Sequence, residues 1–214
     1  MTFPAQFNLS DLNGSNGFIL NSIDAGDNSG YSVSGAGDIN GDGFDDLIIG
    51  AAGADPNGLS SGESYVVFGS DQGFAARVNL ADLDGGNGFI LNGIDALDNS
   101  GIWVNGAGDI NGDGFDDLII GANGAEPNGY DSGESYVVFG SDQGFAARAE
   151  LADLNGSNGF ILNGIDAGDG SGGSVSGAGD INGEGFDDLI IGAIGADPNG
   201  NGSGESYVVF GSDQ

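Results

Sequence analysis

One nine-residue stretch places oxygen-bearing side chains at the spacing of a cation-binding loop. It runs Asp38-Ile39-Asn40-Gly41-Asp42-Gly43-Phe44-Asp45-Asp46, with oxygen side chains at positions 1, 3, 5 and 9 and glycine at position 6. Calcium takes six to eight oxygen ligands at about 2.3–2.6 Å, and glycine permits the sharp turn that brings positions 1, 3 and 5 together. We therefore expect calcium here, bound by the side chains of Asp38, Asn40, Asp42 and Asp46 and by the carbonyl oxygen of Phe44.

The same loop occurs three times, at intervals of 71 residues, in segments 38–46, 109–117 and 180–188. The corresponding ligands are Asp109, Asn111, Asp113, Phe115 and Asp117 in the second loop, and Asp180, Asn182, Glu184, Phe186 and Asp188 in the third. Glu184 replaces the Asp found at position 5 of the other two loops, and its extra methylene changes the reach of the carboxylate. We expect about one calcium ion per repeat, with weaker binding in the third.

Two alternative explanations fit the loops less well. Asn, Asp and Gly favour turns without any ligand, but turn formation alone does not explain three copies with the same offsets. An EF-hand has a Glu at position 12 and a helix on either side, whereas position 12 here is Ile49, Ile120 or Ile191. The flanking segments are rich in glycine and β-branched residues, which favour strands. The sequence therefore predicts a calcium loop that joins two strands.

The composition excludes several classes of function. The 214 residues have a formal net charge of −31, and the only cationic side chains are Arg77 and Arg148, so no basic surface for a nucleic acid can form. The absence of Cys and His excludes zinc sites, disulfides and thiol nucleophiles. Paired carboxylates such as Asp45 and Asp46 could act in glycoside hydrolysis, but Asp46 is better explained as a calcium ligand, and Asp45 and its equivalents Asp116 and Asp187 as exposed residues. We therefore expect no enzyme activity.

The whole chain is a threefold repeat. Its period of 71 residues divides it, after two leading residues, into repeats 3–73, 74–144 and 145–214. The first repeat has strand-like runs at 17–21, 31–37, 47–51 and 64–69, separated by turn signals rich in Gly, Asn and Asp. No segment has an apolar period of 3.6 residues. Short strands with glycine-marked turns are typical of β-propeller blades, so we expect an all-β fold of three four-stranded blades.

Two segments of each repeat resemble FG-GAP repeats, which occur in the propellers of integrin α-subunits and of bacterial relatives. In the first repeat they are Gly-Ala-Gly-Asp-Ile-Asn-Gly-Asp-Gly-Phe-Asp-Asp-Leu-Ile-Ile-Gly-Ala (35–51) and Gly-Glu-Ser-Tyr-Val-Val-Phe-Gly-Ser (62–70). The resemblance implies a propeller with one calcium loop per blade and an inner strand at 31–38. It also implies that strand 18–23 is the outer strand of the preceding blade. Integrin propellers have seven blades, whereas this chain holds three.

The resemblance further implies an extracellular or cell-surface role in adhesion or protein binding, in which calcium is structural. The N-terminal residues lack the basic and apolar regions of a signal peptide. No run of about 18 apolar residues is present, so we expect no membrane insertion.

Three blades are too few to close a propeller, since known propellers have about 4–8 blades. The run 7–20 would supply the outer strand of a preceding blade, whereas the last repeat lacks an outer strand. Two chains joined head to tail would therefore give 2 × 3 = 6 blades, and we expect a homodimeric six-bladed ring.

The three repeats differ from one another chiefly in two loops. One holds Gly26, Leu97 and Gly168, with Tyr31, Trp103 and Gly173 nearby, and the other holds Leu59-Ser60, Tyr130-Asp131 and Asn201-Gly202. We expect both loops on the face opposite the calcium loops, where Trp103 and Tyr130 could anchor a protein or glycan ligand. Neutral variation on an exposed face also explains these differences. A carbohydrate-binding propeller and a purely architectural self-assembling repeat protein are the alternatives to an adhesion module.

Overall fold

The computed structural model of the protein describes residues 5–213, so the outermost limits of the predicted repeats, at residues 3 and 214, lie outside it. These residues form β-strands, turns and the short 3₁₀ helices η1 (Leu9–Asp11), η2 (Leu80–Asp82) and η3 (Leu151–Asp153). No α-helix occurs in the described part of the chain, and none of its helices is long and apolar enough to cross a membrane. The fold is all-β, as the sequence predicts.

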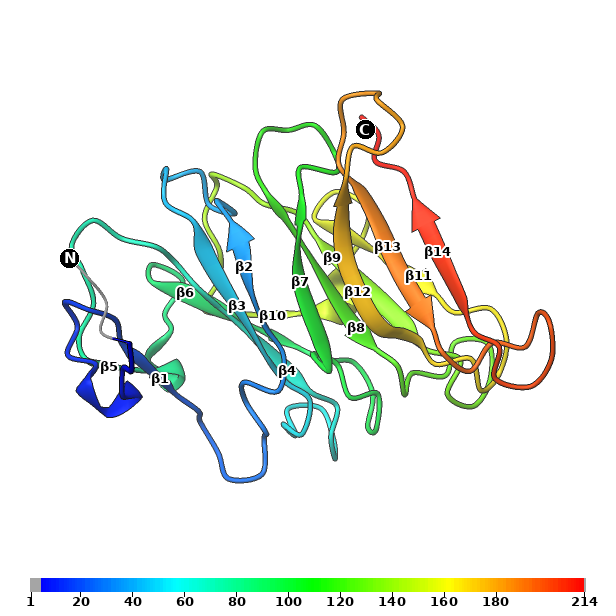
Figure 1. The fold of residues 1–214 in the computed structure, drawn as a ribbon, viewed down its shortest axis with the longest axis horizontal. Helices are drawn as coiled ribbons and strands as arrows, with labels where there is room; N and C mark the ends of the chain where they lie inside the picture. Colours follow the sequence, from blue (N-terminus) through cyan, green and yellow to red (C-terminus); the bar gives the residue numbers. More distant parts are fainter. Residues whose placement is uncertain (1–4, 214) are drawn as a thin grey trace.

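The strands form successive sheets along the molecule (Figure 1). Sheet 1 contains β2 (Val33–Gly37), β3 (Asp46–Ala51), β4 (Glu63–Val67), β6 (Gly88–Asn92) and β10 (Arg148–Glu150). Sheet 2 contains β7 (Trp103–Gly108), β8 (Asp117–Ala122), β9 (Glu134–Val138) and β11 (Gly159–Asn163). Sheet 3 contains β12 (Ser171–Gly179), β13 (Asp188–Ala193) and β14 (Glu205–Val209), and a separate pair contains β1 (Ile19–Asn21) and β5 (Arg77–Asn79).

Sheets 1 and 2 each take an antiparallel outer strand from the following repeat. Strand β6 pairs with β4, with Ile90 opposite Tyr65, and β11 pairs with β9, with Ile161 opposite Tyr136. The resemblance to FG-GAP repeats predicts this exchange. The predicted four strands are seen in sheet 2, whereas sheet 1 gains β10 as a parallel fifth strand and sheet 3 has three strands among the described residues.

The core lies between neighbouring sheets. Ile48 and Val66 of sheet 1 belong to one buried cluster with Val104 and Leu118 of sheet 2. A second cluster joins Ile119 and Val137 of sheet 2 to Val175 and Leu189 of sheet 3. Each sheet is therefore apolar on the faces that meet another sheet, as the apolar run 47–51 predicts for a strand covered on both faces.

The inner strands lie side by side, with β7 between β2 and β12. The Ser34 hydroxyl donates a hydrogen bond of 2.9 Å to Asn105 Oδ1, and the Asn105 amide donates one of 3.4 Å to Ser176 Oγ. A row of equivalent polar side chains thus links one inner strand to the next. This arrangement of successive antiparallel sheets is consistent with a β-propeller-type fold.

Candidate functional site

Each predicted calcium loop connects an inner strand to the strand beside it. Loop 38–46 joins β2 to β3, and the other two loops join β7 to β8 and β12 to β13. Each inner strand ends in an irregularity of register at a glycine, which in β2 is Gly37 with φ of 70°. Gly43, at position 6 of the first loop, has φ of 90°. Position 6 therefore adopts the left-handed conformation that favours glycine.

The side-chain oxygens at positions 1, 3 and 5 of the first loop all accept hydrogen bonds from backbone N–H groups of that loop. The Asp38 carboxylate accepts bonds of 3.0 and 2.9 Å from the N–H groups of Asp42 and Gly43. Asn40 Oδ1 accepts a bond of 2.8 Å from Asp42, and Asp42 Oδ1 accepts one of 2.9 Å from Phe44. The second loop repeats these contacts. The backbone thus holds all three side chains against the turn.

The carboxylate at position 9 is fully buried and ties its loop to the third strand. Asp46 accepts bonds of 3.1 Å from Ile39 N–H and 2.7 Å from Gly69 N–H. The pKa of Asp46 is raised to about 6, chiefly by burial and also by the negative charges of Asp42 and Asp38, against the lowering effect of the two backbone hydrogen bonds. Positions 1, 5 and 9 are therefore close enough for their charges to repel.

Burial raises the pKa of Asp117 in the second loop to about 7, with Asp113 and Asp109 as the repelling neighbours. Three mutually repelling carboxylates and an amide oxygen form a donor set suited to a hard divalent cation. No group of three or more His, Cys, Asp or Glu side chains in residues 5–213 is already arranged as a metal cluster. The fit to calcium rests on the donor chemistry and the repulsion, and the ligand assignment, including the Phe44 carbonyl, stays a prediction.

The third loop differs from the first two at Glu184. Asp180 accepts backbone bonds from Glu184 and Gly185 in the same way as its counterparts, and the Gly185 bond is the largest cause of a lowered pKa for Asp180. Within the described residues, the Glu184 carboxylate accepts no bond from Phe186 N–H, whereas Asp42 and Asp113 accept the equivalent bond. The longer side chain is therefore not held against the turn.

The Asp at position 8 of the loop was expected to be exposed. In two of the three copies it is instead partly buried and accepts a hydrogen bond. Asp116 Oδ2 accepts a bond of 2.8 Å from Asp38 N–H in the preceding repeat, and Asp187 Oδ2 accepts one of 3.0 Å from Asp109 N–H. Asp45 is exposed, as expected. Sequence reasoning missed this link, although the presence of Asp at position 8 in every repeat was a signal for it.

The variable loops lie together at the other end of the strands, as predicted. Leu97 N–H donates a bond of 2.8 Å to the carbonyl of Leu59, and Gly168 N–H donates one of the same length to that of Tyr130. A hollow of about 710 Å³ there is lined by Leu97, Tyr130 and acidic residues that include Asp98 and Glu134. The pKa of Asp98 is raised to about 6, chiefly by burial and also by the charges of Asp95, Glu134 and Glu126, against the lowering effect of the hydrogen bond from Asp95 N–H.

Trp103 and Tyr130, the two aromatic residues expected to anchor a ligand, do not form an aromatic pair with each other among the described residues. Among the described residues the aromatic contact of Trp103 is with Tyr31, at 6.2 Å between ring centroids and an interplanar angle of 71°. Tyr130 lines the hollow, and Trp103 is not among the residues that line it. The Tyr31–Trp103 pair and Tyr130 are therefore two separate exposed aromatic features.

Comparison with known proteins identifies the repeated unit. The FG-GAP repeat model matches residues 29–67 and 102–138, which contain the first two loops. Phosphatidylinositol-glycan-specific phospholipase D of Bos taurus is 34% identical over 167 residues, which are 77% of this chain and 18% of that protein. Integrin alpha-5 of Xenopus laevis and integrin alpha ina-1 of Caenorhabditis elegans are each 32% identical, over 78% and 82% of this chain and 15% of each integrin.

The relatives thus include an enzyme as well as integrin subunits, and this chain spans less than a fifth of the length of each. The residues that the family model matches run from the turn before the inner strand, through the loop and the second strand, into the third strand. These are the same elements that hold the candidate calcium ligands. The chain is therefore an FG-GAP repeat protein, related to the α-subunits of integrins.

Proposed function

We propose that this chain is a calcium-binding FG-GAP propeller that acts as a protein-binding module in adhesion, outside the cell or at its surface. The observation that carries the calcium assignment is the set of repelling carboxylates in the first two loops, where burial and neighbouring charges raise the pKa of Asp46 and Asp117. A cation that binds there relieves this repulsion, and calcium is the cation that an all-oxygen donor set favours.

In this proposal calcium is structural and supplies positive charge where the chain is most acidic. Asp46 links the loop to Gly69, just beyond β4, so an ion held by Asp38, Asn40, Asp42 and Asp46 stabilises the junction of three strands. One ion per repeat would add six positive charges to a chain of net charge −31. Such an excess of negative charge opposes a compact fold unless counter-charge is bound.

Support for protein binding comes from the relationship to integrin α-subunits and from the surface of the variable loops. Leu59, Leu97 and Tyr130 are exposed there, although their side chains are large and apolar or aromatic. Aromatic residues are favoured at recognition surfaces. The similarity to the phospholipase covers 18% of the length of that protein. The proposed function includes no enzyme activity.

Calcium binding is tested by calorimetric titration and by thermal unfolding with and without excess EGTA. We expect about one ion per repeat with Kd on the order of 10⁻⁴–10⁻³ M, typical of extracellular modules, and a marked fall in the melting temperature in EGTA. Magnesium should restore stability poorly, because it requires a tighter octahedral shell. A melting temperature unaffected by EGTA would contradict a structural role.

Matched variants separate ligation from net charge. Asp42→Asn should abolish one binding event, whereas Asp71→Asn removes the same charge from an exposed residue outside the calcium loops and should leave binding nearly unchanged. In the third loop, Glu184→Asp should tighten calcium binding by several fold, because the shorter carboxylate can be held by Phe186 N–H as in the other loops. Three equivalent sites in the unmodified chain, unaffected by Glu184→Asp, would overturn the assignment at position 5.

A carbohydrate-binding propeller is the second candidate function, and the exposed Tyr31–Trp103 pair favours it. Aromatic rings on a surface can stack on sugars. Binding to a glycan array that is lost in Trp103→Ala and kept in Tyr130→Ala would support this function. Binding to cell-surface proteins without glycan binding would support adhesion instead.

A further inference from the structure

The face of sheet 3 that points away from sheet 2 exposes apolar side chains at positions that are buried elsewhere in the molecule. Ile190, Val208 and Phe210 are 39%, 46% and 58% exposed. Their counterparts 71 residues earlier, Ile119, Val137 and Phe139, are 0%, 0% and 6% exposed because sheet 3 covers them. The free face of sheet 3 thus has the side chains of an inter-sheet contact without a covering sheet among residues 5–213.

The opposite end of the molecule exposes the other half of the same contact. Val33 and Leu47 of sheet 1 are 64% and 38% exposed. Their counterparts in sheet 2, Val104 and Leu118, are 3% and 0% exposed because they pack against sheet 1. Figure 1 shows sheet 2 between sheet 1 and sheet 3, so each of these two end sheets has one face that no other sheet of the described chain covers.

Glycine positions show that the two free faces are also complementary in shape. A Cβ on Gly50 or Gly121 would collide with the carbonyl oxygen of Gly101 or Gly172 in the next sheet, so these backbones meet without side chains. The counterparts at the two ends are Gly192 and Gly30. No atom lies within 4 Å of a Cβ built on Gly30, and nothing nearer than 3.5 Å meets one on Gly192. Both glycines leave room for the same close approach.

We propose that two copies of this chain join head to tail, with sheet 3 of each covering sheet 1 of the other. The occupant of each free face is a second copy because the two faces repeat the two sides of the contacts already present within the chain. A head-to-tail contact closes into a ring when its rotation permits. Each contact between sheet 3 of one copy and sheet 1 of the other is called a seam below. Two seams give a ring of six sheets, which is within the usual range of about 4–8 blades.

The strand edges supply the register of the proposed seam. Strand β4 pairs with β6 so that Glu63 lies opposite Asn92, and the equivalent edge of β14 has no partner strand among the described residues. The counterpart of β6 is β1, which pairs only with β5 in the described structure. In the ring, β1 of the second copy adds antiparallel to β14, with its Asn21 opposite Glu205.

The two arginines make this register specific. Arg148 donates to Glu63 Oε1 at 3.0 Å and to Asn92 Oδ1 at 3.4 Å. Arg77, its counterpart, donates to Asn21 at 3.3 Å and has no ion pair in the described part of the chain. The counterpart of Glu63 is Glu205. The proposed seam therefore places Glu205 of one copy beside Arg77 of the other and completes the same three-residue cluster.

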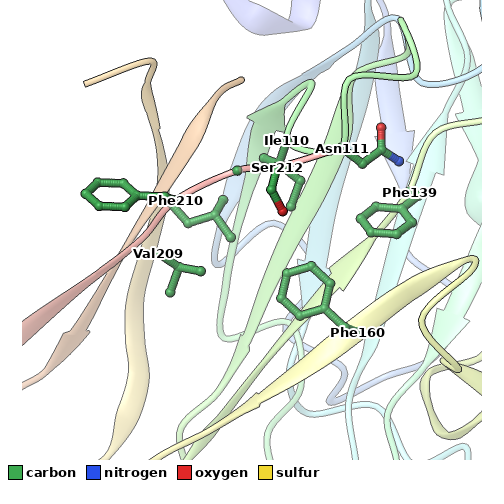
Figure 2. A pocket seen from close by; sticks show the side chains of 9 residues that line it. Ile110, Asn111, Phe139, Phe160, Val209, Phe210 and Ser212 are labelled. Atoms are coloured by element: carbon green, nitrogen blue, oxygen red, sulfur yellow. The ribbon is translucent and has the colours of Figure 1, made fainter. Parts of the chain in front are cut away.

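A pocket of about 80 Å³ lies beside this edge (Figure 2). Figure 2 shows Phe139 and Phe160 facing it, with Val209 and Phe210 on the neighbouring chain segment. At the equivalent place in sheet 1, the ring of Phe145 stacks on that of Phe89 at 4.2 Å between centroids and lies 5.9 Å from that of Phe68. No third ring fills the space in sheet 2 within the described residues. The pocket thus opens where the N-terminal part of the second copy would approach.

The inference does not depend on calcium binding and is tested by light scattering of the full chain in calcium buffer at micromolar concentrations. We expect twice the 21.1 kDa mass of one chain. Val208→Glu, on the free face of sheet 3, should give monomer, whereas Leu97→Glu, on the variable-loop surface, should leave the dimer intact. A folded monomer of the unmodified chain would overturn the proposal, and so would a mass that grows with concentration, which would indicate an open array.

A charge exchange distinguishes the seam from loss of folding. Arg77→Glu and Glu205→Arg should each weaken the dimer by roughly 10²-fold, because each places like charges together. An equimolar mixture of the two variants should regain dimer, since both seams of the mixed ring then pair opposite charges. Circular dichroism of each variant should match that of the unmodified chain. Failure of the mixture to associate more tightly than either variant alone would overturn the Arg77–Glu205 pairing.

Discussion

The two ends of the sheets hold neighbouring repeats together in different ways. At the calcium-loop end, a side-chain bond, which Asp116 accepts from Asp38 N–H at 2.8 Å, adds to backbone bonds such as that from Ser141 N–H to the Ile39 carbonyl at 2.8 Å. At the variable-loop end, the variable positions themselves are joined backbone to backbone, as Leu97 N–H is to the Leu59 carbonyl at 2.8 Å. The side-chain bond requires a particular side chain, and the backbone bonds do not.

This difference explains where the repeats vary. Position 8 of the calcium loop is Asp in every repeat, whereas the variable loops read Leu59-Ser60, Tyr130-Asp131 and Asn201-Gly202. Because backbone atoms maintain the packing of the variable loops, their side chains can change without loss of the contact. An exposed surface that can change without cost to the fold is a suitable place for recognition.

The largest effect is expected at the buried carboxylate of the middle loop. Asp117→Ala removes the acceptor for Ile110 and Gly140 N–H, which it now binds at 3.0 and 2.9 Å. Leaving a buried donor unsatisfied costs about 1–3 kcal/mol, so the free energy of unfolding should fall by roughly 2–5 kcal/mol. Urea denaturation in EGTA excludes any contribution from calcium. Asp117→Asn keeps one acceptor and should cost less, and equal losses in the two variants would contradict this account.

A smaller effect of opposite sign is expected at the variable-loop end on acidification. The pKa of Asp98 is raised to about 6 in the folded chain, above about 3.9 for an unfolded Asp. Its ionisation therefore opposes folding, so this residue stabilises the fold below the unfolded pKa and the contribution is lost as pH rises through 6. Lowering the pH from 7 to 5 should raise the free energy of unfolding by about 1 kcal/mol.

The measurement is the difference in that pH dependence between the unmodified chain and Asp98→Asn. The amide oxygen that this substitution introduces can still accept the bond from Asp95 N–H, so the variant loses the titration and retains the contact. Asp55→Asn, on an exposed residue of the same end, is the control and should leave the pH dependence unchanged. Identical pH profiles for the unmodified chain and Asp98→Asn would show that the titration lies elsewhere.

Much of the fold followed from local sequence. The β-branched runs predicted β3 and β4, because a strand covered on both faces needs a continuous apolar segment. Strands β5 and β10 were missed because each is a three-residue segment with polar ends, and its pairing depends on a neighbour far away in the chain. The 3₁₀ helices were missed for the same reason, since one turn has no apolar period.

For the candidate site too, local features were predicted and contacts between distant residues were missed. Residue type and spacing within nine positions suggested the ligands, because the chemistry of the loop is local. The link from Asp116 to Asp38 spans 78 residues and depends on how two repeats pack, so the Asp at position 8 of every repeat signalled a role but could not identify its partner. The partner of Trp103 was missed for the same reason, since Tyr31 reaches it from the preceding repeat.

A moderate effect is expected where position 8 joins two repeats. Asp116→Ala removes the acceptor for Asp38 N–H, and a hydrogen bond of this kind contributes about 1 kcal/mol. Asp45→Ala makes the same substitution in the same sequence context at an exposed residue, and should change stability by less than about 0.5 kcal/mol. Both substitutions are measured by urea denaturation in a chain that also carries Val208→Glu. This background keeps the chain monomeric, so the two changes in the free energy of unfolding can be compared. Equal effects would show that the inter-repeat bond does not contribute.

The smallest effect is expected at the variable loops, and it tests the other half of the comparison. Leu97→Ser and Tyr130→Ser change side chains that are exposed, while the bonds from Leu97 N–H to Leu59 and from Gly168 N–H to Tyr130 use backbone atoms. Each free energy of unfolding should stay within about 0.5 kcal/mol of the unmodified value. Hydrogen exchange at the amides of Leu97 and Gly168 measures the contact itself, and its protection should persist. Loss of that protection would mean that the side chains hold these loops in place, and the variable end would then be under the same constraint as the calcium-loop end.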